Sequence, residues 1–143
     1  MIKRTYPQSR LRRTRSKGYL RDLIAENHLS TNDLIQPIFI ADQSEAKVEI
    51  PSMPGIYRHN LESLYVETEE LVNKGVKAVA IFPAIDSSKK DQKGSHAFDD
   101  KNIVCMALRG LADKFPEVIK IADVALDPYT DHGHDGVLFD GKV

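Results

Sequence analysis

The residues best suited to chemistry in this sequence lie in one segment, DVALDPYTDHGHDG at positions 123–136. Aspartate recurs there at every fourth position, and two histidines stand between the last two aspartates: Asp123, Asp127, Asp131 and Asp135, with His132 and His134. Clustered carboxylates can hold a protonated amine, a hard cation such as Mg²⁺, or a proton shared between two of them. The residues alone do not choose among these three occupants. A fourth alternative is a solvated acidic loop in which the histidines only fix the turn.

The spacing of the aspartates does not predict a helix. On a helix the four carboxylates would share one face and repel one another, and a proline and two glycines interrupt the segment. We expect instead the end of a strand followed by a loop. Because side chains alternate along a strand, Asp123, Ala125 and Asp127 are predicted to share one side of it. Residues 131–135 would follow on the loop.

The apolar runs along the chain predict an α/β fold. Asn60 is expected to cap the clearest helical pattern and Gly75 to end it, while Pro116 stops a later one. The predicted elements are, in order, a short helix at 18–28, a strand at 34–40, a long loop at 41–58, a helix at 61–72, a strand at 77–85, a helix at 103–111 and a strand at 118–126. Strands that alternate with helices are typical of parallel sheets.

Two parallel architectures fit this order. A doubly wound sheet usually has a glycine fingerprint after its first strand, and residues 41–43 contain no glycine. A TIM (β/α)₈ barrel carries its chemistry on the loops after its strands, which suits the polar loops at 86–95 and 127–136. We therefore favour the barrel. Since that fold typically needs about 250 residues, we expect a barrel truncated after about its third strand.

Basic residues are concentrated at the start of the chain. Residues 1–17 hold seven of the twenty basic side chains and no acidic one, so the remainder carries thirteen basic against twenty-one acidic side chains. We predict an extended arm at 1–17 and the barrel part at 18–143. An arm that packs on the acidic body of a neighbouring subunit explains both halves of this asymmetry. A solvated tail is the alternative, and nucleic acid is not expected because no binding motif accompanies the arm.

Composition also indicates the compartment of the protein and whether it associates with a membrane. Cys105 is the single cysteine, so no internal disulfide can form and a reduced, cytoplasmic location is expected. No apolar run approaches the roughly 20 residues needed to span a bilayer, and no signal-type segment opens the sequence. We therefore expect no membrane partner.

Five motifs, in order along the chain, carry a family resemblance. They are RLRRTR at 10–15, PSMPGIYR at 51–58, AIFPAID at 80–86, KDQKGSHA at 90–97 and DVALDPYTDHGHDGV at 123–137. Together they resemble the N-terminal half of the porphobilinogen synthases (5-aminolevulinate dehydratases), over nearly the whole chain.

The resemblance implies a lyase that condenses two molecules of 5-aminolevulinate to porphobilinogen in tetrapyrrole and heme biosynthesis, with loss of water. It implies a TIM barrel whose arm embraces a neighbour, commonly within a homo-octamer. Members form Schiff bases through two lysines on later strands, and neither position exists in this chain. We therefore expect no catalytic lysine here and no activity of the chain alone. Lys89 and Lys90 are interpreted as solvated loop residues.

The resemblance also bears on the metal. In zinc-dependent relatives the positions matching Ala125, Asp127 and Asp135 are cysteines, so this chain resembles the aspartate-type branch, commonly stimulated by Mg²⁺. Carboxylates suit Mg²⁺ as thiolates suit zinc. Asp127 and Asp135 are expected to contact the substrate amine or a hydrated Mg²⁺, with Asp123 as a further substrate-binding residue, and no three-cysteine zinc site is expected.

Two alternatives to this function remain. One is a truncated, non-catalytic assembly module that associates with full-length subunits through its arm. The other is a carboxylate site for a divalent metal that serves a different barrel reaction.

Overall fold

The chain divides into two compact units, residues 1–30 and 31–143. The computed structural model describes residues 5–7, 9 and 12–142. In the first unit a 3₁₀ turn, Arg13–Arg15, precedes the short helix α1, Gly18–Leu23. The helix predicted at 18–28 therefore ends five residues early, and Tyr19, Leu23 and Ile24 are exposed, so little packing supports a longer one. Lys3, Arg4 and Arg10 of the predicted arm lie outside the described residues, and the arm boundary at residue 17 stays a prediction.

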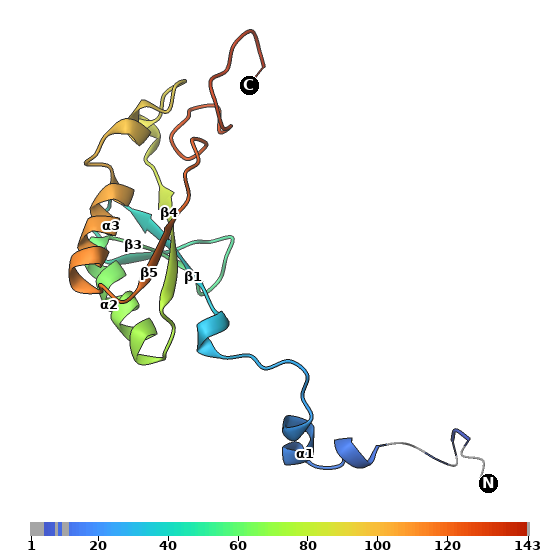
Figure 1. The fold of residues 1–143 in the computed structure, drawn as a ribbon. Coiled ribbons are helices and arrows are strands. Elements are labelled where there is room, and N and C mark those ends of the chain that lie inside the picture. Colours follow the sequence, from blue (N-terminus) through green and yellow to red (C-terminus); the bar gives the residue numbers. More distant parts are fainter. Residues whose placement is uncertain (1–4, 8, 10–11, 143) are drawn as a thin grey trace. The chain divides into compact units, whose positions relative to one another are not determined.

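The second unit is built on one five-stranded sheet (Figure 1). Its strands are β1 (Gln36–Ala41), β2 (Lys47–Glu49), β3 (Tyr57–His59), β4 (Ala78–Ala84) and β5 (Ile119–Ala122), in the spatial order β2-β3-β1-β4-β5. The three predicted strands are confirmed as parallel neighbours, since β4 pairs with both β1 and β5. Two crossovers connect them in sequence order, as in a (β/α)₈ barrel.

The predicted loop at 41–58 is wrong in part, because it contains two strands. β3 pairs in parallel with β1, and β2 pairs antiparallel with β3. Each has only three residues, and β2 is exposed along its length, so neither produces the apolar alternation that reveals a strand in sequence.

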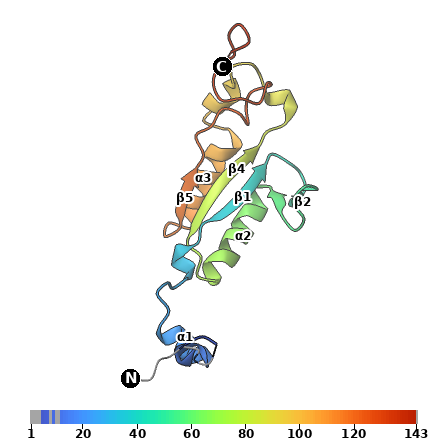
Figure 2. The same ribbon diagram turned by 90° about the vertical axis from the view of Figure 1, so that its right-hand side faces the viewer.

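The two crossover helices lie on one side of the sheet (Figures 1 and 2). Helix α2 spans Leu61–Asn73 and α3 spans Ile103–Lys114. The Asn60 side chain accepts a hydrogen bond from the Ser63 N–H at 2.9 Å, which confirms the predicted cap. Gly75 follows α2 with a φ of 88°, a left-handed conformation that favours glycine and ends the helix.

The core lies between the helices and one face of the sheet. The strands contribute Ile38, Ile40, Val79 and Ile81, and the helices contribute Leu64, Leu71, Ala107 and Leu111. The opposite face of the sheet is also apolar but more open: the Phe39 and Phe82 rings meet there at 5.9 Å, and Ile121 is 39% exposed. In a barrel, that second face looks inward.

Helices α2 and α3 approach closely where Tyr65 packs against Gly110. A Cβ at residue 110 would collide with Tyr65 Oη and lie 2.6 Å from Cζ. We expect Gly110→Ala to lower the free energy of unfolding by about 1–3 kcal/mol, the usual cost of overpacking, although alanine favours helices. Equilibrium urea denaturation measures this. Adding Tyr65→Phe removes the colliding hydroxyl and should restore part of the loss; absence of any rescue would contradict the assigned contact.

His59 predicts a pH dependence of stability. It is buried on β3 with Nδ1 at 2.7 Å from Ser63 Oγ, and this burial lowers the pKa of His59, with Lys47 acting in the same direction and Glu67 opposing it. The folded state therefore disfavours the protonated ring, so this contribution to stability is present above the ordinary pKa of about 6.5 and is lost as the pH falls below it. Urea denaturation at pH 7.5 and 5 should show the loss, and His59→Gln should show less of it.

Candidate functional site

The acidic segment begins where β5 ends. That strand stops at Ala122, so the prediction of a strand to residue 126, with Asp123, Ala125 and Asp127 on one side of it, is wrong. β5 pairs with a single neighbour, and the last partner pair joins Ile81 to Ala122. β4 continues to Ala84, but the chain of β5 leaves it after that pair, and Val124 is 99% exposed. Asp123 is thus an exposed residue just beyond the strand.

Asp135 closes the acidic loop onto itself. Its Oδ1 accepts hydrogen bonds from the N–H groups of Leu126 at 2.6 Å and Asp127 at 3.1 Å. Thr130 lies inside the turn, 1% exposed, and its Oγ1 donates to the His134 carbonyl at 3.0 Å. The structure thereby brings Asp127 and Asp135 to the same turn. The Asp127 carboxylate is exposed and makes no hydrogen bond to another described residue.

The closed loop is docked on the loop that follows β4. The Asp91 N–H donates to the Tyr129 carbonyl at 3.3 Å, and the Asp131 N–H donates to the Asp91 carbonyl at 3.1 Å. Gly94 has a φ of 62° and lies against Leu126. Both loops stand at the end of the sheet where β1 and β4 finish (Figures 1 and 2). This is the edge at which barrel enzymes hold their catalytic residues.

The two histidines contribute to the turn. His132 Nε2 lies 3.3 Å from the Gln92 carbonyl, and its Nδ1 accepts from the His134 N–H at 3.3 Å. A neutral ring with its proton on Nε2 satisfies both contacts. These contacts agree with histidines that fix the turn, a role that the sequence had left as one alternative.

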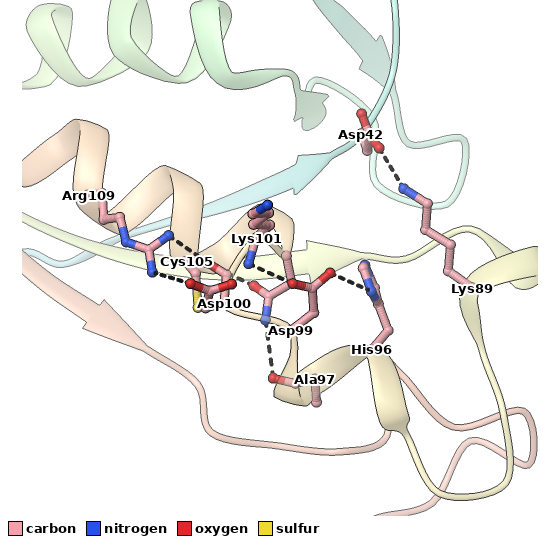
Figure 3. A network of polar contacts seen from close by, with 10 residues as sticks. Asp42, Lys89, His96, Ala97, Asp99, Asp100, Lys101, Cys105 and Arg109 are labelled. Atoms are coloured by element: carbon pink, nitrogen blue, oxygen red, sulfur yellow. Dashed lines mark hydrogen bonds and ion pairs between the residues drawn. The ribbon is translucent and has the colours of Figure 1, made fainter.

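The supporting loop is itself held by several polar contacts. The Asp91 Oδ1 accepts from the N–H groups of Ser95 at 3.0 Å and Lys93 at 2.8 Å, and these hydrogen bonds, that of Ser95 foremost, lower the pKa of Asp91. Figure 3 shows how the loop continues into α3, where Arg109 donates to the Asp100 carbonyl at 2.6 Å. Asp91 and Gly94 were not singled out from the sequence, although an aspartate three residues before a glycine is a turn signal.

Lys89 is exposed, as expected for a loop residue, and it also forms an ion pair. Its Nζ pairs with Asp42 Oδ2 at 2.6 Å, joining the loop after β4 to the end of β1 (Figure 3). The hydrogen bond to Asp42 raises the pKa of Lys89, which keeps the amine protonated. Schiff-base chemistry needs the opposite shift. Lys90 is half-buried and lines a hollow at the strand ends.

The carboxylates fit a hydrated hard cation better than a thiolate-bound metal. Within residues 5–7, 9 and 12–142, no three His, Cys, Asp or Glu side chains come together in a ready ligand group. One oxygen of Asp135 is already used by the turn, which leaves its other oxygen and the Asp127 carboxylate. Mg²⁺ commonly keeps several waters and takes one or two carboxylates. The absence of a three-cysteine zinc site stays a prediction.

Comparison with known proteins then decides the family. The family model of delta-aminolevulinic acid dehydratase matches residues 8–143. The chain belongs to this family. Among its curated relatives, the delta-aminolevulinic acid dehydratase of Chlamydia pneumoniae is 46% identical over 94% of this chain and 40% of its own length. That of Helicobacter pylori is 44% identical over 94% of this chain and 41% of its own length. The chain thus spans about two fifths of these relatives.

A solved delta-aminolevulinic acid dehydratase shares the fold. The Toxoplasma gondii structure, in complex with the reaction product porphobilinogen, superposes with a TM-score of 0.86 at 39% identity, over 93% of this chain and 38% of that one. The predicted α/β class and partial TIM barrel are confirmed. Among the described residues of this dehydratase-family chain, no helix has the length and apolar character needed to cross a membrane.

Proposed function

We propose that this chain forms the part of a porphobilinogen synthase that supplies its acidic active-site loop. The complete enzyme would condense two molecules of 5-aminolevulinate to porphobilinogen and release water. The observation that carries the proposal is the closed loop of residues 126–135, docked at the carboxyl ends of the parallel strands. The family membership supports it, as does the product named in the Toxoplasma gondii complex.

Each aspartate has a separate proposed role. The amine of 5-aminolevulinate is protonated in solution near neutral pH, and a nearby carboxylate stabilises that charge. Asp127 would bind the amine directly or through water, and Asp123, exposed at the end of β5, would add a second negative charge to the approach. Asp135 would contribute its remaining oxygen while its Oδ1 holds the turn. The Schiff-base lysines implied by the resemblance would come from later strands.

The test is a full-length chimera, because the chain spans 40% of its Chlamydia pneumoniae relative. This chain replaces the matching stretch of that relative, and porphobilinogen formation from 5-aminolevulinate is measured. We expect an active chimera. A folded chimera that consumes no 5-aminolevulinate, with or without Mg²⁺, would contradict the proposal and favour a different barrel reaction.

We further propose Mg²⁺ as the cation at Asp127 and Asp135. When bound there, the ion would neutralise the paired carboxylates and fix their waters. Removal of divalent ions from the chimera with a chelator should lower its activity, and added Mg²⁺ should restore it. Asp127→Asn should weaken this Mg²⁺ response. Asp131→Asn, a carboxylate removed from the same loop, should leave it intact. Restoration by one equivalent of zinc but not by Mg²⁺ would contradict the assignment.

The arm is proposed to bind a neighbouring subunit of the same enzyme in a cytoplasmic homo-oligomer. Its basic side chains would contact the acidic remainder, residues 18–143, of the neighbouring subunit. Deletion of residues 1–17 from the chimera should reduce its mass in light scattering after size exclusion. Mixing the chain with the intact relative tests the assembly-module alternative, which requires a mixed complex.

A further inference from the structure

Thr130 is a buried polar side chain inside the acidic loop. It is 1% exposed, whereas the carboxylates of Asp127 and Asp135 on the same loop are open to solvent. A hydroxyl group removed from water lowers stability unless it forms hydrogen bonds inside the protein. The partners of the Thr130 hydroxyl therefore show which part of the loop depends on it.

The hydroxyl reaches both sides of the turn. Its Oγ1 lies 3.0 Å from the His134 carbonyl oxygen and 3.4 Å from the Asp127 carbonyl oxygen, so its one proton is shared and the shorter contact is the stronger. The His134 carbonyl belongs to the peptide that leads directly into Asp135. The other carbonyl belongs to Asp127 itself. One hydroxyl thus holds the backbone beside both carboxylates.

The rest of Thr130 contacts the supporting loop. A Cβ at residue 94 would lie 3.5 Å from Thr130 Cγ2, so the methyl group packs over Gly94. The backbone of Thr130 pairs with Asp91 in an isolated bridge. The two branches of the side chain therefore have separate partners, the acidic loop for the hydroxyl and the supporting loop for the methyl. Valine removes only the hydroxyl, and serine removes only the methyl.

We propose that the Thr130 hydroxyl holds the Asp127 carboxylate in the position from which it binds the substrate. This rests on the proposed function, in which Asp127 binds the amine of 5-aminolevulinate. Thr130 is enclosed by the turn and acts through Asp127, so it is a positioning residue. Such a role affects the reaction because a displacement of about 1 Å in an active site can lower the rate about 100-fold.

The experiment measures activity and hydrogen exchange in the full-length chimera. Thr130→Val should lower kcat/KM for 5-aminolevulinate roughly 5- to 30-fold, the effect of one lost hydrogen bond. Exchange should rise by a similar factor at the Leu126 and Asp127 amides, which are bonded to Asp135 across the turn. Thr130→Ser should keep both properties near those of the parent. If the valine variant does not fold, Thr130→Ala replaces it, because alanine differs from serine only by the hydroxyl.

A double-mutant cycle distinguishes positioning from general support of the fold. In an Asp127→Asn background, Thr130→Val should lower kcat/KM less than about threefold, because the charge that it positions is already gone. Thr68→Val is the matched control. It removes another buried hydroxyl, bonded to the Leu64 carbonyl at 2.8 Å within α2, and should leave exchange at the two loop amides unchanged.

Three outcomes would contradict these proposals. An equal loss from Thr130→Val in both backgrounds would overturn this inference alone, as would a folded Thr130→Val chimera with the activity of the parent. A folded parent chimera without activity would overturn the proposed function and this inference with it.

Discussion

Asp127→Asn should lower kcat/KM of the full-length chimera for 5-aminolevulinate roughly 30- to 150-fold. This corresponds to the loss of one hydrogen bond to a charged group, about 2–3 kcal/mol. The substitution is informative because the Asp127 carboxylate takes part in no hydrogen bond within the described structure, while its backbone N–H donates to Asp135. Asparagine preserves the volume and the backbone contact and removes only the charge.

Two matched comparisons distinguish the effect of the Asp127 charge on activity from the effect of the loop structure. Asp131→Asn removes a carboxylate from the same loop, and we expect its activity to stay near that of the parent. Asp135→Asn keeps an oxygen that can accept from Leu126 and Asp127, so it should retain the turn and lose the charge, whereas Asp135→Ala should lose both. Equal activity of the Asp127→Asn and Asp131→Asn chimeras would show that Asp127 has no special role with the substrate.

Gly94→Ala should detach the acidic loop from the loop that supports it. With a φ of 62°, residue 94 is left-handed, and a Cβ there would lie 3.2 Å from Leu126 Cδ2 and 3.5 Å from Thr130 Cγ2. The backbone conformation alone costs a non-glycine residue about 1–2 kcal/mol, and the contact with the acidic loop adds to it. Because the two loops are joined at Asp91, the part of this strain that comes from the contact with the acidic loop is relieved when this junction opens.

Hydrogen exchange at the Asp131 amide measures the detachment directly, since that N–H is bonded to the Asp91 carbonyl. An opening made easier by 1–2 kcal/mol should speed this exchange about 5- to 30-fold, and activity of the chimera should fall with it. Gly55→Ala is the matched control: its φ is 79°, and nothing lies within 4 Å of the added Cβ. If both variants exchanged alike at Asp131, the contact between Gly94 and the loop would have no energetic role.

The sequence by itself determined the elements whose signals are local. Asn60 and Gly75 mark the two ends of α2, because a cap and a left-handed terminator act within one helical turn. The continuous apolar runs identified β1 and β4, since strands covered on both faces need few polar residues. The alternation of these elements was sufficient to predict a parallel α/β fold, the polar loops after the strands favoured the barrel, and the five motifs indicated the family.

Only the tertiary structure decided how the site is assembled. β5 ends at Ala122, although the apolar run continues, because the chain leaves its neighbour β4 after the Ile81–Ala122 pair, and a strand persists only while its backbone pairs with a neighbour. Asp42 and Lys89 pair across 47 positions of sequence, and Arg58 reaches the hollow through the pairing of β3 with β1. Such contacts depend on which segments become neighbours in space, and no local pattern of residue types encodes that.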